Sequence, residues 1–268
     1  MLQWRKYKKG VTAVANRSDY IAVFDSGVGG ISVLRQLRKQ LPNERYLYFG
    51  DSANAPYGTR PEKAIRALTL AAAEKLVAQG VKALVVACNT ATAVAIDILR
   101  ETYPELIVVG VEPALKVGAD KYPGGRIGVM ATPVTLEGDK FHRLLVRFAD
   151  GCQVSLISAP GLADLVEKGE QNGPKGEALL QRLLEPYRGK LDALVLGCTH
   201  YPFARETIQK VLGSETELLD GGEGTAVQTM HLLQSKNLLN DGQGEVVFQN
   251  SLSDPHILEL SRQLAGLE

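Results

Sequence analysis

The chain has 268 residues, of which 45% are hydrophobic and 22% are charged, as is usual for a globular protein. Thirty basic residues balance thirty acidic ones, so bulk charge gives no support for binding nucleic acid or an acidic membrane. The sequence has no apolar run of about eighteen residues, so we expect no membrane span. Three cysteines are too few for a disulfide framework, which favours a reducing, cytoplasmic location.

Residues 1–19 form a basic stretch in which the apolar run "VTAVA" is too short for the core of a signal peptide. We therefore interpret this stretch as a solvated N-terminal extension that precedes the folded part of the chain.

Short apolar runs then alternate with helical patterns. The helix-like segment 61–80 begins with proline and ends with glycine, as helices often do. Strand-like runs occur at 20–25, 45–51, 83–87 and 107–112. This alternation predicts an α/β fold built on a parallel sheet.

The same order restarts after Gly124-Gly125. Segment 126–138 resembles 20–32, segment 153–160 takes the place of 45–51, and segment 191–202 resembles 81–92. We therefore predict two similar doubly wound parallel-sheet domains that arose by duplication.

The last 45 residues contain a helix-like stretch (225–234), the strand-like "EVVFQN" and the helix-like "PHILELSRQL". They are too short for a core of their own, so we expect them to pack on the first half. The predicted domains are 20–114 plus 224–268, and 115–223.

Polar turns follow the strands. In open parallel sheets, ligands bind beyond the carboxyl ends of the strands, where helix N-termini favour anions. The turn "DSGVGG" lacks both the lysine of a phosphate-binding loop and the spacing of a dinucleotide fingerprint. The turns are "DSGVGG" (25–30), "APYG" (55–58), "CNT" (88–90), "ATPVT" (131–135) and "CTH" (198–200). They predict a small anionic ligand held mostly by neutral donors.

Cys88 and Cys198 occupy matched turns after buried strands, whereas Cys152 has no polar neighbours in sequence and fits simple packing. A helix N-terminus is expected to lower the pKa of such a thiol. Without a CxxC motif, zinc is not supported. Two thiols on opposite sides of a bound molecule could remove a proton from one face and return one to the other, without a cofactor.

The motifs "FDSGVGGISVL", "YFGDSANAPYG", "VVACNTATA", "LVLGCTHYPF" and "LLDGGEGTA" closely resemble those of the cofactor-independent glutamate racemases, over roughly residues 20–230. The resemblance implies interconversion of L- and D-glutamate, which supplies D-glutamate for peptidoglycan. It also implies a site in the cleft between the two domains, a homodimer, no cofactor and no metal.

The same resemblance assigns residues. Those implied to act in catalysis are Cys88, Cys198, Asp25, His200 and Glu167. Those implied to contact substrate are Asp25, Ser26, Tyr57, Gly58, Asn89, Thr90, Thr132, Thr135, Thr199 and His200. Where many relatives carry a serine and a tyrosine, this chain has Gly138 and Phe141.

Two other functions fit the same residues. An aspartate racemase of the same superfamily would differ mainly in how the side-chain carboxylate is held. A non-catalytic ligand-binding protein could use the same cleft, although binding alone requires neither cysteine.

Overall fold

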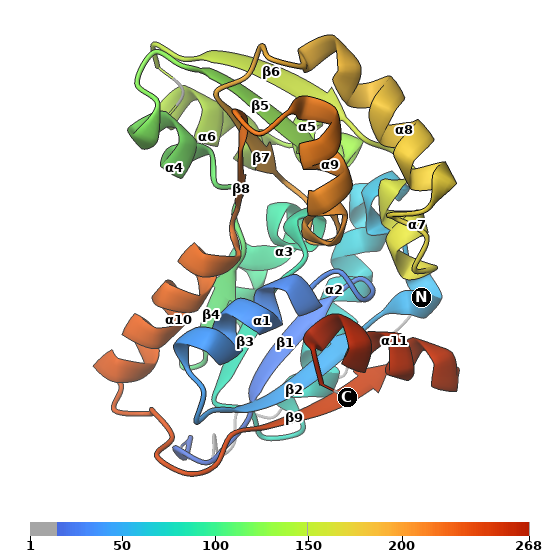
Figure 1. Ribbon diagram of the computed structural model, residues 1–268. Coiled ribbons are helices and arrows are strands. Elements are labelled where there is room, and N and C mark those ends of the chain that lie inside the picture. The colour runs from blue at the N-terminus through green and yellow to red at the C-terminus, as the bar shows by residue number, and fades with distance from the viewer. Residues whose placement is uncertain (1–14, 149, 268) are drawn as a thin grey trace.

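The computed structural model describes residues 15–148 and 150–267, so residues 1–14 of the predicted extension lie outside the described residues. Within the described part, the strands form two parallel sheets, each flanked by helices on both faces (Figure 1). The fold is therefore the predicted α/β class with two doubly wound units. No helix among these residues has the length and apolar character needed to cross a membrane.

The first sheet has the order β4-β3-β1-β2-β9, and all its neighbouring strands are parallel. The strands β1 to β4 are almost entirely buried, because helices cover both faces of the sheet and the apolar runs fill the space between. The strands are β1 (Ile21–Asp25), β2 (Arg45–Gly50), β3 (Ala83–Val86), β4 (Ile107–Gly110) and β9 (Glu245–Asn250).

Helices α1, α10 and α11 pack on one face of this sheet, and α2 and α3 pack on the other. The predicted helix at 61–80 is α2, and the chain leaves it through Gly80, whose φ of 76° suits glycine. The helices are α1 (Ile31–Gln40), α2 (Glu62–Val77), α3 (Asn89–Thr102), α10 (Gly222–Ser235) and α11 (Pro255–Ala265), with the short 3-10 helices η1 (Ser52–Asn54) and η2 (Tyr57–Thr59).

The second sheet has the order β6-β5-β7-β8 and is also parallel throughout. Its strands are β5 (Arg126–Ala131), β6 (Gln153–Ser158), β7 (Ala193–Leu196) and β8 (Glu217–Asp220). One face packs against α4 (Leu115–Lys121), α5 (Pro133–Glu137) and α6 (Asp139–Phe148). The other packs against α7 (Leu162–Glu167), α8 (Pro174–Leu184), α9 (Arg205–Leu212) and the 3-10 helices η3 (Glu185–Tyr187) and η4 (Tyr201–Ala204). Strand β8 was not among the predicted strands.

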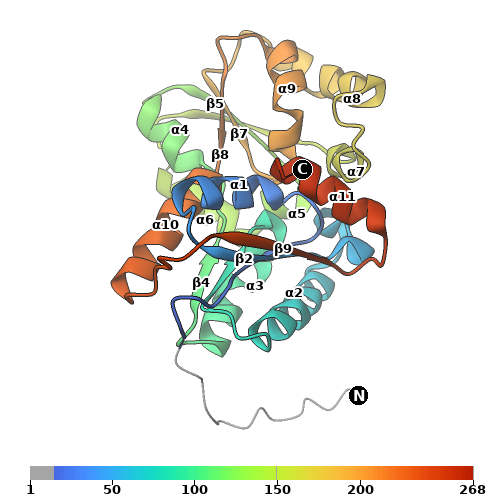
Figure 2. The ribbon, with the colours of Figure 1, turned by 60° about the horizontal axis from the view of Figure 1, so that its bottom comes forward.

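The two sheets repeat one topology. The order β4-β3-β1-β2 in the first matches β8-β7-β5-β6 in the second. The register matches as well, since Val23 pairs with Val85 in the first sheet and Val129 pairs with Val195 in the second. The two similar units predicted from the sequence are therefore confirmed, while β9 at the edge beside β2 has no counterpart (Figure 2).

The two halves exchange helices at their junction. Helix α4 follows β4 but packs against α6 and the second sheet, whereas α10 follows β8 but packs against α1 and β4 (Figure 1). The end of the predicted extension lies against the first half, because the Arg17 guanidinium donates to Asn237 Oδ1 at 2.5 Å. The proposed domain boundaries themselves stay a prediction.

Candidate active site

Cys88 and Cys198 lie two residues beyond the ends of equivalent central strands, β3 and β7, where the two sheets face each other. Both are free and buried, at 4% and 8% exposure. Cys152 lies directly before β6, at the amino end of its strand, whereas the other two cysteines follow the carboxyl ends of theirs. Its Sγ lies 3.7 Å from the Tyr122 carbonyl oxygen. The two matched cysteines are thus distinct from the third.

Cys88 is the N-cap of α3, and its Sγ accepts a hydrogen bond from Ala91 N at 3.5 Å. It also donates to Ser26 Oγ at 3.5 Å. Burial, reinforced by the charge of Asp25, nevertheless raises the pKa of the Cys88 thiol to about 12. The helix N-terminus acts in the expected direction, since the bond from Ala91 N lowers the pKa, but desolvation of the thiolate outweighs it.

Asp25 ends β1 and is completely buried. Its Oδ1 accepts from Gly27 N and its Oδ2 accepts from Thr199 Oγ1, both at 2.9 Å. Burial raises the pKa of this carboxyl, although the charge of His200 and the two donors act in the opposite direction. The bond from Thr199 ties the two halves together directly beside the cysteines.

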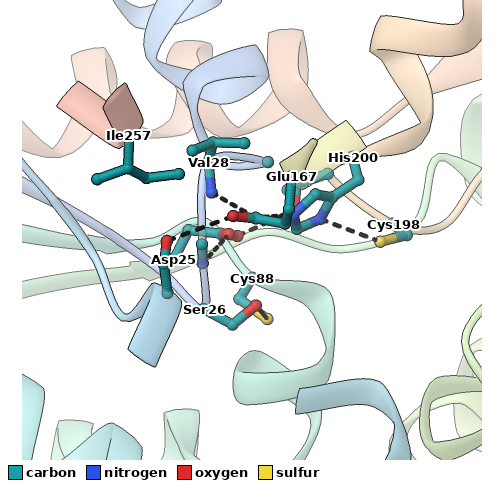
Figure 3. A network of polar contacts seen from close by, with 12 residues as sticks. Asp25, Ser26, Val28, Cys88, Glu167, Cys198, His200 and Ile257 are labelled. Atoms are coloured by element: carbon teal, nitrogen blue, oxygen red, sulfur yellow. Dashed lines mark hydrogen bonds and ion pairs between the residues drawn. The ribbon is translucent and has the colours of Figure 1, made fainter. Parts of the chain in front are cut away.

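Cys198 has a different set of partners. His200 Nδ1 lies 3.7 Å from Cys198 Sγ, and His200 Nε2 lies 2.6 Å from Glu167 Oε1. Figure 3 shows Glu167 between Val28 and His200, with Cys198 beyond the histidine ring. Glu167 and His200 are far apart in the sequence. They meet because Glu167 is the last residue of α7, which lies beside the turn after β7.

Both members of this ion pair are held in their charged forms. Burial acts to lower the pKa of His200, but hydrogen bonds with Cys198 and Glu167 and the charges of both raise it well above its usual value. Burial acts to raise the pKa of Glu167, but the bonds from His200, Val28 N and Ser52 outweigh it and lower that pKa. An imidazolium therefore faces the Cys198 sulfur.

Two glycines of the "DSGVGG" turn allow this arrangement. A Cβ on Gly27 would lie 1.9 Å from Glu167 Oε1, and a Cβ on Gly29 would lie 2.3 Å from His200 Nδ1. The close approach that these glycines permit is therefore between this turn and two side chains of the other half.

Three of the predicted threonines form one cluster across the two halves. Thr90 Oγ1 lies 3.1 Å from Thr132 Oγ1 and 3.4 Å from Thr135 Oγ1, and Thr132 donates to Thr135 at 3.0 Å. Gly58 adjoins the same cluster, because a Cβ there would lie 2.6 Å from Thr132 Cγ2. These four predicted substrate contacts thus lie together, whereas the fourth predicted threonine, Thr199, binds Asp25.

The other predicted contacts are buried nearby. Ser26, Asn89 and Tyr57 are 5%, 7% and 1% exposed. Asn89 Oδ1 has no hydrogen-bond partner among the described residues. The Tyr57 hydroxyl donates to Asp51 Oδ2 at 2.6 Å, and burial raises the pKa of Tyr57 far above its usual value.

Asp51 and Ser52 were not among the predicted site residues. Asp51 is 5% exposed, accepts from Tyr57, and directly follows β2. An acid immediately after a buried strand, as in "YFGD", is the signal that could have identified it. Ser52 donates to Glu167 Oε2 at 3.3 Å, a contact that only the fold reveals.

Gly138 and Phe141 occupy the two positions at which the resemblance implies a serine and a tyrosine in many relatives. Phe141 is 3% exposed and packs in the cluster that contains Ala131 and Leu136. Neither residue supplies a side-chain hydrogen bond there.

Comparison with known proteins agrees with this geometry. The sequence profile of the Asp/Glu/Hydantoin racemase family matches residues 27–229. A glutamate racemase of Clostridium novyi is 44% identical over 92% of this chain and 97% of its own length. The crystal structure of glutamate racemase isoform RacE1 from Bacillus anthracis superimposes with a TM-score of 0.86 at 30% identity, covering 94% of this chain and 96% of the other.

A third similar protein is the Escherichia coli glutamate racemase, solved with L-glutamate and the activator UDP-MurNAc-ala. Its TM-score is 0.80 at 32% identity, with 92% of each chain covered. A doubly wound pair of sheets with matched cysteines defines the class, and the chain belongs to the Asp/Glu/hydantoin racemase family. Within that family it belongs to the glutamate racemases, which are isomerases acting on amino acids.

Proposed function

We propose that this enzyme interconverts L- and D-glutamate by proton transfer between the substrate and two cysteines, Cys88 and Cys198, without a cofactor. The observation that carries the proposal is the equivalence of the two cysteines. Each lies two residues beyond an interior strand, β3 or β7, and these strands occupy equivalent places in two sheets that repeat one topology.

The reaction balances with these two groups alone. The thiolate of one cysteine takes the α-proton, and the electron pair of the broken C–H bond passes into the substrate carboxylate. The thiol of the other cysteine then gives its proton to the opposite face of the α-carbon. The substrate leaves inverted, and the two cysteines have exchanged protonation states.

The residues around each cysteine support different starting states. His200 faces the Cys198 sulfur and is held by Glu167, so it can stabilise the negative charge when Cys198 acts as the base. The raised pKa of Cys88, beside buried Asp25, favours Cys88 as thiol. One direction of the reaction then begins with Cys198 as base and Cys88 as acid, and the other begins after the protons have been exchanged.

Polar groups suited to an amino acid surround the cysteines. The first N–H groups of α3 and the threonine hydroxyls can donate to carboxylates. Asn89 Oδ1 is a buried acceptor without a partner among the described residues, and a substrate ammonium could donate to it. Since both cysteines are buried, glutamate gains access when the two halves separate.

We also propose the biological setting that the relatives imply. The D-glutamate formed would serve peptidoglycan synthesis, in the cytoplasm, with the enzyme as a homodimer. The support is the similarity to glutamate racemases over more than nine tenths of the chain.

The experiment is incubation of purified protein with L-glutamate in deuterium oxide, with no added cofactor. We expect D-glutamate carrying deuterium at the α-carbon, and the corresponding product from D-glutamate. Equal turnover of aspartate would overturn the choice of substrate. Binding of glutamate without inversion or exchange would instead identify a ligand-binding protein.

A further inference from the structure

Strand β9 is the part of the first sheet that the second sheet does not repeat. It runs parallel to β2 and ends at Asn250, which is paired with Gly50 at the end of β2 (Figure 2). The end of β2 leads directly into Asp51 and Ser52. The added strand therefore brings an amide side chain to the edge of the sheet where the active site lies.

The orientation of the Asn250 amide is determined by its two partners. Its Oδ1 accepts from Leu252 N at 2.8 Å, so its NH₂ group faces the other way and donates to Ser52 Oγ at 2.9 Å. The NH₂ group is a donor only. Ser52 must therefore accept from Asn250, which leaves its single hydroxyl proton for Glu167 Oε2, 3.3 Å away.

Both carboxylate oxygens of Glu167 have hydrogen-bond partners. Its Oε1 accepts from Val28 N at 2.7 Å and lies 2.6 Å from His200 Nε2, while Oε2 accepts from Ser52. His200 Nδ1 then faces Cys198 Sγ. A continuous series of hydrogen bonds thus connects the end of β9 with one of the two sulfurs.

We infer that Asn250 is a positioning residue for the Cys198 half of the site, acting through the Ser52 hydroxyl on Glu167 and His200. Asn250 touches neither sulfur, so its effect must be indirect. It aims the serine proton at the carboxylate, which keeps Glu167 ionised and fixed against the histidine. This inference rests on the proposed role of Cys198 as a base.

The titratable groups that interact with Glu167 come from three elements. They are His200 after β7, Asp25 at the end of β1 and Tyr48 on β2. Of these, only His200 donates a hydrogen bond to the carboxylate. Loss of the Ser52 donor would therefore raise the pKa of Glu167, since hydrogen bonds to the ionised form lower it.

The decisive variant is Asn250→Asp. It keeps an oxygen to accept from Leu252 N, so the turn after β9 is preserved, but it cannot donate to Ser52. The serine hydroxyl then donates to the new carboxylate instead of to Glu167. We expect the acid limb of the pH profile of kcat/KM to move to higher pH by roughly 0.3–1 pH unit. We also expect kcat to fall about three- to tenfold, with KM little changed.

Equal stability of the two enantiomers forces equal kcat/KM values, so the selective readout is α-hydrogen exchange in single-cysteine backgrounds. The losses should appear in exchange catalysed by Cys198 in Cys88→Ala, and not in exchange catalysed by Cys88 in Cys198→Ala. Ser52→Ala, which changes no charge, should move the same limb in the same direction. The double variant Ser52→Ala/Asn250→Ala should shift it no further than Ser52→Ala alone, because Asn250 acts through the serine.

Asn240→Asp is the matched control. Asn240 also accepts from the N–H two residues later and donates a bond, to the Asn43 carbonyl, but it lies beside the start of β2, at the far end from the site. This variant should leave the profile unchanged.

An unmoved acid limb in both Asn250→Asp and Ser52→Ala would overturn the inference, as would equal losses in the exchange catalysed by Cys198 and in that catalysed by Cys88. Additive shifts in the double variant would also overturn it. The unmodified enzyme tests the proposed function separately. If it racemises glutamate, the proposed function holds, and a failure of the variants contradicts only the positioning role of Asn250.

Discussion

The two halves of the molecule share a topology but not a chemistry. In the first half, Cys88 is the N-cap of a helix beside a buried carboxyl, and its pKa is raised to about 12. In the second half, Cys198 faces a histidine that is paired with Glu167. A repeated backbone can therefore place two equivalent thiols among different polar neighbours, a buried carboxyl for Cys88 and a histidine–glutamate pair for Cys198.

The two halves also differ at the amino ends of β3 and β7, where equivalent positions carry different ion pairs. Lys82 and Asp192 occupy equivalent positions, each directly before β3 or β7 in its own half. Lys82 N donates to the Tyr20 carbonyl before β1, and Asp192 N donates to the Arg126 carbonyl at the start of β5. Lys82 pairs with Glu44 inside the protein, at 0% and 1% side-chain exposure, whereas Asp192 pairs with Arg126 at the surface.

The largest expected effect is that of removing either thiol. Cys88→Ala and Cys198→Ala should each lower racemisation by about 10²–10⁴-fold, because a positioned acid or base is lost. Each variant should retain α-hydrogen exchange with the one enantiomer whose proton faces the remaining sulfur. Exchange measured by NMR in deuterium oxide tests this.

Cys152→Ala is the control for these variants and should keep the parent rate, since Cys152 contacts a backbone carbonyl beside β6. Full racemisation by Cys88→Ala or Cys198→Ala would refute the two-base mechanism.

The next effect concerns stability. Lys82→Met should lower the free energy of unfolding by about 3–5 kcal/mol, because it leaves the Glu44 carboxylate buried without its cation. Asp192→Asn, at the equivalent position of the second half, should change stability little, since an exposed pair is screened by water. Denaturant unfolding of the two variants measures the contrast, and equal losses would contradict it.

The smallest expected effect is a shift in pH dependence. In the parent, Glu167 helps to keep the pKa of His200 well above its usual value, so activity that needs the imidazolium is lost only as pH rises through that raised pKa. Glu167→Gln removes the negative charge, so the pKa of His200 should fall and the alkaline limb should move to lower pH by about one unit or more.

The profile of kcat/KM for each enantiomer measures this shift. It should be the same for both enantiomers, because they are equally stable and kcat/KM must then be equal in the two directions. A limb that stays in place or moves to higher pH would contradict the role of Glu167 in holding His200 protonated.

Local sequence pattern was enough to predict the strands that precede the two cysteines. Apolar runs such as "ALVV" and "ALVL" can only be buried strands in this alternation, and their carboxyl ends meet at one edge of a parallel sheet. That reasoning predicted the polar turns at Asp25, Cys88 and Cys198. It missed β8, whose short "ELLD" run has only one fully buried residue.

The difference between the surroundings of the two thiols depends on contacts between distant parts of the chain. Glu167 reaches His200, and Asn250 reaches Ser52, across long separations in the chain, and no local pattern encodes those contacts. The rise in the pKa of Cys88 likewise depends on burial where the two halves meet. Local sequence sets where a strand ends, whereas desolvation and hydrogen bonding depend on what the folded chain packs against that end.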